Sequence, residues 1–75
     1  MEAQKITNLR QALLAESAIN FTAMVDHSKD IEKLSKEPDK PGNAERIAEY
    51  EEKIARLIAK NSTITKQLNE LPPMM

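Results

Sequence analysis

The segment Glu37-Pro38-Asp39-Lys40-Pro41-Gly42-Asn43 decides the fold of this chain, because a helix cannot continue through it. Each of its prolines lacks an amide donor and turns the preceding residue away from helical geometry. On both sides of this segment, apolar residues recur at helical spacing in stretches free of proline and glycine. The second stretch ends where Pro72 and Pro73 follow it. We therefore expect one domain, residues 1–75, with helices at about 5–36 and 44–71, a loop at about 37–43 and a short tail at 72–75.

The start of the second helix carries its own signals. Asn43 is a residue type that caps helix N-termini, because its side-chain oxygen can accept a hydrogen bond from a free amide of the first turn. Glu45 follows in that turn, where a negative charge is favoured by the helix dipole. The sequence thus predicts that Asn43 is the N-cap.

A regular heptad pattern predicts that the two helices pack in one antiparallel register. In an antiparallel pair, facing residues have numbers with a constant sum, and the apolar positions of this chain satisfy a sum of 81. At the far end, Leu9 or Arg10 continues the seam of the first helix. The facing pairs are Leu34 with Ile47, Ile31 with Tyr50, His27 with Ile54, Met24 with Leu57, Asn20 with Asn61, Ser17 with Ile64 and Leu13 with Leu68. The expected fold class is all-α, an antiparallel, coiled-coil-like two-helix hairpin.

Two amides face each other in the middle of this seam. Asn20 and Asn61 could hydrogen-bond directly and so set the register, at some cost in stability. Alternatively, each side chain could reach solvent at the edge of the seam. The sequence leaves both alternatives open.

One flank of the seam is charged. The pairs Glu37 with Arg46, Asp30 with Lys53 and Glu16 with Gln67 share a sum of 83, so they should face each other across the helices. Such solvated pairs are worth about 0 to 1 kcal/mol each.

The other flank carries an apolar stripe that the two-helix seam does not bury. An exposed apolar patch on so small a protein is typical of an interface. The patch could be the core of a homodimer, in which two hairpins form a four-helix bundle, or the docking site of a different protein. A strip of alanines on the second helix, Ala44, Ala48, Ala55 and Ala59, would also let a helix approach, although helix propensity explains it equally well. The stripe consists of Leu14, Ala18, Phe21, Val25 and Ile58.

Size and composition also point to association. A chain of 75 residues buries little apolar surface, so a bound partner or a second copy is expected to stabilise it. It has no cysteine, and no apolar run of the roughly 20 residues that span a bilayer. The net charge of −1 comes from mixed charges, which argues against a nucleic-acid partner. We expect a soluble, cytoplasmic protein without a membrane partner.

No group of residues has the pattern of a catalytic, cofactor or metal site. Asp26-His27-Ser28 contains the residue types of a hydrolytic triad, but successive helical side chains point about 100° apart and cannot converge. His27 with Asp30 could supply two metal ligands, although a lone histidine in a seam is more often a packing residue. A basic row on the second helix is offset by acids of the first and has no aromatic platform, so it is best read as a solvated face. We expect no enzyme, no cofactor and no metal.

One family resemblance rests on the turn. Leu34-Ser35-Lys36-Glu37-Pro38-Asp39-Lys40-Pro41, followed by Ala48-Glu49-Tyr50, resembles the helix-loop-helix of type III secretion needle subunits. Those subunits are similarly short hairpins with a double-proline turn. The resemblance implies a structural or chaperone-type subunit of a secretion apparatus, a class that should polymerise or need a chaperone.

The function that the residues themselves favour is a small interaction module. A self-associating helical hairpin of this size would act by occupying a surface of another protein, as an adaptor or inhibitor. Phages and other mobile elements encode small adaptors or inhibitors of this kind.

Overall fold

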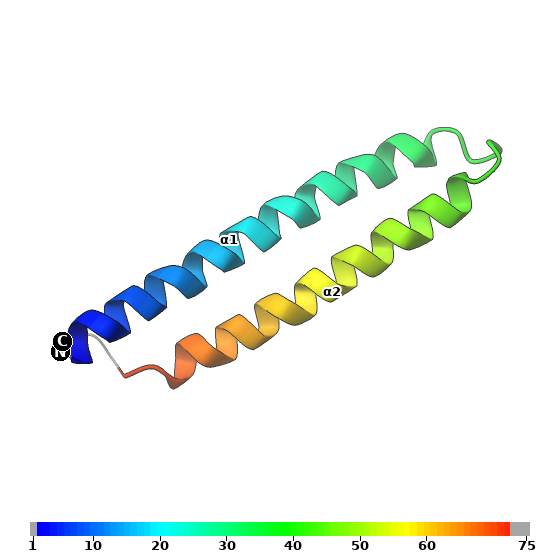
Figure 1. Ribbon diagram of the computed structural model, residues 1–75. Helices are drawn as coiled ribbons and strands as arrows, with labels where there is room; N and C mark the ends of the chain where they lie inside the picture. Colours follow the sequence, from blue (N-terminus) through cyan, green and yellow to red (C-terminus); the bar gives the residue numbers. More distant parts are fainter. Residues whose placement is uncertain (1, 73–75) are drawn as a thin grey trace.

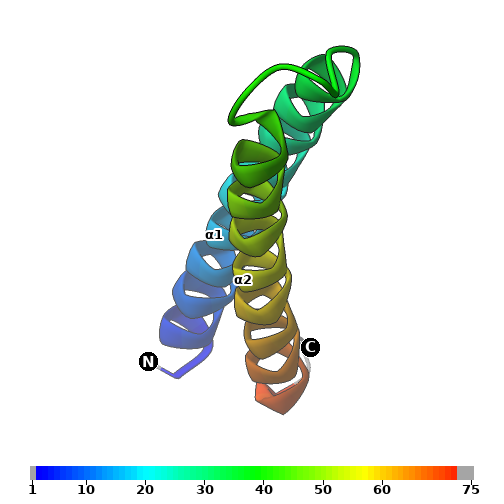
Figure 2. The same ribbon diagram turned by 90° about the vertical axis from the view of Figure 1, so that its right-hand side faces the viewer.

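The protein is a hairpin of two long antiparallel α-helices, which lie side by side (Figure 1) and cross at an angle, so that they diverge towards the end away from the loop (Figure 2). The computed structural model describes residues 2–72. Helix α1 spans Glu2–Ser35 and helix α2 spans Asn43–Glu70. The hairpin measures 58 × 14 × 14 Å between Cα atoms, with the loop at one end and both termini at the other. The expected all-α hairpin is confirmed.

The helix boundaries differ from the expected ones by one to three residues. Helix α1 begins at residue 2 rather than about 5, because Ala3, Gln4 and Lys5 are all good helix formers. Helix α2 ends at Glu70, because Leu71 precedes a proline and takes an extended backbone, with φ −72° and ψ 144°. Residues 73–75 of the expected tail lie outside the described residues.

Asn43 is not the N-cap of α2, contrary to the prediction. The cap position is held by Gly42, whose φ of 85° lies in the left-handed region that glycine adopts without strain. The Gly42 carbonyl accepts the amide of Arg46 at 3.1 Å, which starts the helix. The expectation was wrong because the Asn43 side chain donates to one carbonyl of α1 and one of the loop instead of accepting an amide of the first turn.

Asn43 instead joins the two helices at the turn. Its side chain is buried, and Nδ2 donates to the carbonyls of Leu34 at 3.3 Å and Glu37 at 2.8 Å. The same two carbonyls also accept the backbone amides of Glu37 and Lys40, each at 3.2 Å, so Asn43 adds a second donor to each of them. One amide therefore ties the end of α1 to the first turn of α2.

The core is a single seam between the helices. Every predicted facing residue from Leu13 to Leu34 and from Ile47 to Leu71 is buried or half-buried. Among the described residues, Leu13 and Ile64 are the most buried apolar side chains, at 9% and 4% exposed, and none is completely buried. Such a thin core leaves more than half of each helix surface facing outward.

Arg10, not Leu9, continues the seam at the open end. Arg10 is half-buried while Leu9 is 48% exposed, so the spacing of alternately three and four residues runs unbroken along α1. The Arg10 guanidinium donates from Nη2 to the carbonyl of Pro72 at 2.8 Å. This bond holds the segment after α2 against α1. Neither described helix is long and apolar enough to cross a membrane.

The register predicts that cysteines at two facing seam positions form a disulfide within one chain. Met24 and Leu57 are both half-buried in the seam, and the chain has no other cysteine. Oxidised Met24→Cys/Leu57→Cys protein should run as a cross-linked monomer on a non-reducing gel. Thr22→Cys/Leu57→Cys is the control, because Thr22 is exposed and should not cross-link to Leu57 within the chain. Cross-linking of the first pair only between chains would contradict the closed hairpin.

We also predict that Asn43→Ala lowers the free energy of unfolding by about 1 to 3 kcal/mol, because it removes the two hydrogen bonds that this buried amide donates. Urea denaturation followed by circular dichroism measures the change. Asn69→Ala is the matched control, since Asn69 is exposed in the last turn of α2. Equal midpoints for the Asn43→Ala and control proteins would show that the link at the turn does not stabilise the hairpin.

Candidate interaction surface

A direct hydrogen bond joins the two asparagines in the middle of the seam. Asn20 Nδ2 donates to Asn61 Oδ1 at 2.9 Å, and Asn61 Nδ2 donates to the carbonyl of Ser17 at 3.3 Å. Asn20 is only 8% exposed, so its amide depends on this partner rather than on water. Of the two alternatives that the sequence left open, the structure contains the direct pair.

This pair penalises any other register. A slip of one heptad would place Asn20 against Ile54 or Leu68 instead of Asn61. Burying an amide without a hydrogen-bond partner costs about 1 to 3 kcal/mol, and a slip would leave both amides in that position. The bond thus favours the one register that also sets which residues lie on each edge of the hairpin.

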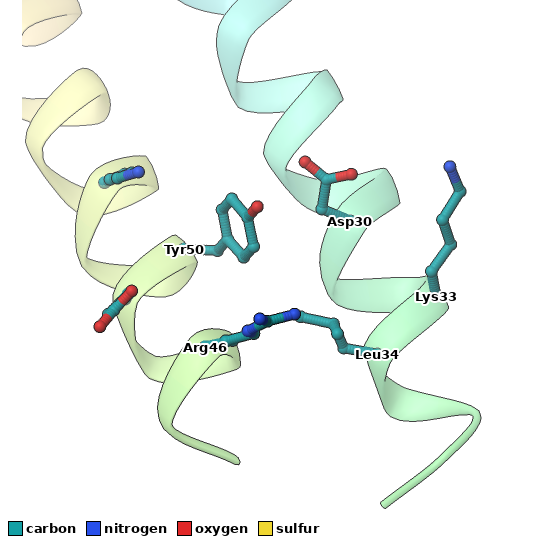
Figure 3. A pocket seen from close by; sticks show the side chains of 7 residues that line it. Asp30, Lys33, Leu34, Arg46 and Tyr50 are labelled. Carbon is teal, nitrogen blue, oxygen red and sulfur yellow. The ribbon is translucent and has the colours of Figure 1, made fainter. Parts of the chain in front are cut away.

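The first edge is charged and hollowed near the loop. One hollow lies where Tyr50 projects from α2 towards α1, close to Asp30 (Figure 3). A second hollow, further from the loop, lies where Ala23 leaves room beside His27. We call this the charged edge. The first hollow is lined by Asp30, Lys33, Leu34, Arg46, Glu49, Tyr50 and Lys53, and the second by Ala23, His27, Lys53, Arg56, Leu57 and Lys60.

The expected charge pairs across this edge do not form. Within residues 2–72 both ion pairs are local: Glu37 with Lys40 at 3.7 Å, and Glu52 with Arg56 at 2.6 Å. Glu37 therefore pairs within the loop and not with Arg46. Side chains three or four residues apart along the chain are neighbours, so they can pair without fixing a side chain on the other helix. This explains why both ion pairs are local.

The other predicted pair is replaced by contacts with an aromatic ring. Lys53 Nζ lies 5.4 Å from the centroid of the Tyr50 ring, at cation–π distance, and makes no ion pair with Asp30. The ring of His27 packs against the same tyrosine, with centroids 5.4 Å apart. Gln67 and Glu16, the third predicted pair, are both exposed and share no hydrogen bond within the described residues.

His27 is placed as a packing residue. Its side chain is half-buried against Tyr50, and its Nδ1 is enclosed without a hydrogen-bond partner among the described residues. The neighbouring Asp26 and Ser28 are exposed. No group of three or more histidine, aspartate or glutamate side chains converges as a metal site in residues 2–72.

The opposite edge of the hairpin carries the predicted apolar stripe. Phe21 is 62% exposed, Ile58 56%, Leu14 53% and Val25 37%, and Ala18 is also exposed. Because both hollows are lined by the charged edge, these residues lie on the side away from them. The structure therefore leaves the stripe uncovered in a single chain.

The stripe extends across the groove between the helices. Residues on this edge face each other when their numbers sum to 79, so Phe21 faces Ile58 and Leu14 faces Thr65. Two small residues of α2, Ala55 and Ser62, lie in the next row outward. We call the whole set the uncharged face. It consists of Leu14, Ala18, Phe21 and Val25 from α1 and of Ala55, Ile58, Ser62 and Thr65 from α2, all exposed.

Charges are absent from the uncharged face and from the same rows towards the open end. Continuing these rows towards the termini gives Gln11 on α1 and Asn69 on α2. Towards the loop, the rows reach Glu32 and Glu51. The charges of the protein thus lie on the charged edge, on the outer surfaces of the helices and in the loop, and not on this face.

Two exposed apolar residues lie outside this face. Ile19 is 69% exposed and shares a shallow depression with Ala18, Thr22, Ala23 and Asp26, while Leu9 lies near the open end. Ile19 belongs to neither apolar row with alternating spacings of three and four residues, so the pattern did not predict it. The alanines at 44, 48, 55 and 59 are all exposed, and Ala55 belongs to the uncharged face.

No family model matches the chain, and no curated protein or solved structure matches it significantly.

The asparagine pair predicts strong energetic coupling between its two members. Asn20→Leu or Asn61→Leu alone should lower the free energy of unfolding by about 1 to 3 kcal/mol, because each strands the other amide. The double substitution should recover most of that loss, since both polar groups are then removed. Urea unfolding of all four proteins in a double-mutant cycle measures the coupling. Purely additive single effects would contradict a structural role for the bond.

Proposed function

We propose that this chain is a small, non-enzymatic protein–protein interaction module that self-associates through the uncharged face and acts by occupying a surface of another protein. The observation that carries the proposal is the exposure of Phe21, Ile58 and Leu14 on one side of a hairpin whose other side is charged. We place its action in the cytoplasm, as an adaptor or inhibitor of the kind that phages and other mobile elements encode.

The size of the core supports association. Burying apolar surface contributes about 25 cal/mol per Å², and only Leu13 and Ile64 among the described apolar side chains are buried to nine-tenths or more. Covering the exposed phenylalanine and its neighbours would add to that stability substantially. A partner on the uncharged face therefore supplies what the single seam lacks.

The chemistry of the face favours a protein partner. A nucleic acid would require a continuous row of basic side chains, and the uncharged face has none. On the charged edge, Lys53 and Arg46 share their hollow with Asp30 and Glu49. An apolar helical surface with a comparable stripe is the complement that this face would bind.

A structural subunit of a secretion apparatus is the second candidate. Its support is the double-proline turn between two long helices, with Tyr50 on the second, which resembles needle subunits. The two candidates differ in solution. An interaction module stops at a defined dimer or tetramer, whereas a needle-type subunit grows in mass with concentration.

We predict that Phe21→Asp weakens self-association by at least about 2 kcal/mol, because a carboxylate would have to be desolvated where a ring was buried. Multi-angle light scattering measures the mass, and circular dichroism checks that the helices persist. Ile19→Asp is the matched control, since Ile19 is equally exposed on the same helix but lies outside the uncharged face.

The comparison of the two variants tests the face directly. We expect Ile19→Asp to keep the mass of the unchanged protein and Phe21→Asp to approach that of a monomer. Equal masses for all three proteins, with a pull-down from the native host also unchanged, would reject the uncharged face as the interface.

A further inference from the structure

We infer that the uncharged face is covered by a second copy of this chain in the opposite orientation, so that the two loops lie at opposite ends of a four-helix bundle. In this arrangement α1 packs against α1 and α2 against α2 of the second copy. The inference rests on the proposed function, which names the face but not how two copies meet on it.

The residues of the stripe on α1 are spaced so that two antiparallel copies of α1 can pair along it. Leu14, Ala18, Phe21 and Val25 are separated by four, three and four residues, a pattern that reads the same in both directions. An antiparallel copy of α1 can therefore place residues opposite each other when their numbers sum to 39. Phe21 then meets Ala18 of the second copy, and Leu14 meets Val25. Each large side chain faces a smaller one, which is how well-packed layers interdigitate.

The residues of the uncharged face on α2 are also spaced symmetrically, about nearly the same level of the hairpin. Ala55, Ile58, Ser62 and Thr65 are separated by three, four and three residues, so a sum of 120 pairs Ile58 with Ser62 of the second copy. The hydroxyl of Thr65 already donates to the carbonyl of Asn61 at 3.0 Å, so it needs no partner across the interface.

One two-fold axis serves both helices. The centre of the α1 pattern lies midway between residues 19 and 20, and the sum of 79 places that level between 59 and 60 on α2. The centre of the α2 pattern is residue 60. The two centres agree within half a residue, or about 0.75 Å along a helix.

The alternative dimer, with both loops at one end, packs less evenly. Phe21 and Ile58 already lie at one level of the hairpin, so that arrangement would bring both pairs into a single layer. The next layers would contain only small residues such as Ala18 and Ser62. Crowding in one layer beside gaps in the next costs stability in both places.

The charges favour the same choice. Glu32 and Glu51 are the acids nearest the uncharged face, and both lie towards the loop. With the loops together, four carboxylates would gather at one end of the interface. With the loops apart, Glu32 faces Thr7 and Glu51 faces Asn69 of the second copy, so like charges are separated.

The area is sufficient for a stable dimer. The whole side of the hairpin that carries this face measures 58 by 14 Å between Cα atoms, or about 810 Å² in projection, close to the roughly 800 Å² per partner of standard protein interfaces. A dimer of that size uses contacts along both helices and not only at residues 14–25 and 55–65. A second copy offers a surface of the same length, row spacing and chemistry. It therefore covers the uncharged face from end to end.

A distance between the two loops tests the orientation. Because the chain has no cysteine, Asp39→Cys introduces a single spin-label site in the exposed loop, far from the proposed interface. Residue 39 lies about 29 Å along the hairpin from the proposed axis, so the two labels should be about 55 to 60 Å apart. With both loops at one end, the same labels would be about 20 Å apart or closer.

Controls separate the orientation from the face itself. Thr22→Cys, labelled near the axis on the exposed outer side of α1, should give a distance roughly half as long or less in the proposed dimer. A short loop-to-loop distance in a dimer that Phe21→Asp dissociates would overturn the orientation but leave the proposed face standing. A monomeric mass, or a dimer that Phe21→Asp does not weaken, would overturn both.

A mixture of two single-cysteine chains provides an independent readout. Oxidation of Leu14→Cys chains mixed with differently tagged Val25→Cys chains should produce a mixed disulfide dimer at least tenfold more abundant than one between Leu14→Cys and Thr65→Cys chains. If α1 faces α2 of the second copy instead, the disulfide between Leu14→Cys and Thr65→Cys chains should be the more abundant one. That result would contradict the inference.

Discussion

The register between the two helices is the constraint on which the remaining structure depends, and the hydrogen bond from Asn20 to Asn61 is its most specific determinant. Apolar seam residues alone would tolerate a slip of one heptad, because leucine and isoleucine are interchangeable in a thin core. The amide pair is not interchangeable with them, since a slip would bury both amides without a hydrogen-bond partner. Everything placed on the two edges, including Phe21 opposite Ile58, follows from that alignment.

The seam and the exposed stripe could be predicted from the sequence because both are periodic. A heptad pattern and a proline-bounded turn fix which residues face inward, and a second pattern displaced around α1 must then face outward. The helix ends and the role of Asn43 could not be predicted in this way. The role of Asn43 depends on which carbonyls lie within reach of its amide, a matter of a few ångströms that spacing does not encode. The helix ends depend on local helix propensity and on the proline after Leu71.

On the charged edge, the side-chain contacts in the structure differ from those that the sequence pattern predicts. Facing positions are necessary for an ion pair but not sufficient, because exposed lysines and arginines choose among several partners of similar energy. Here Arg56 pairs with Glu52 on its own helix, and Lys53 lies over Tyr50. The edge as a whole was predictable, but the individual contacts on it depend on side-chain conformations that the sequence does not fix.

The absence of charge from one edge links this fold to the association that we propose. A two-helix hairpin has one seam, so an apolar residue outside it has no intramolecular place to go, and α1 carries two apolar rows while α2 carries little beyond one. Evenly scattered charges would keep such a hairpin monomeric. Concentrating them on the side of Asp30 and Lys53 leaves the side of Phe21 free of the desolvation cost that charged groups impose on an interface. The second apolar row therefore gains its stability only when another helical surface covers it.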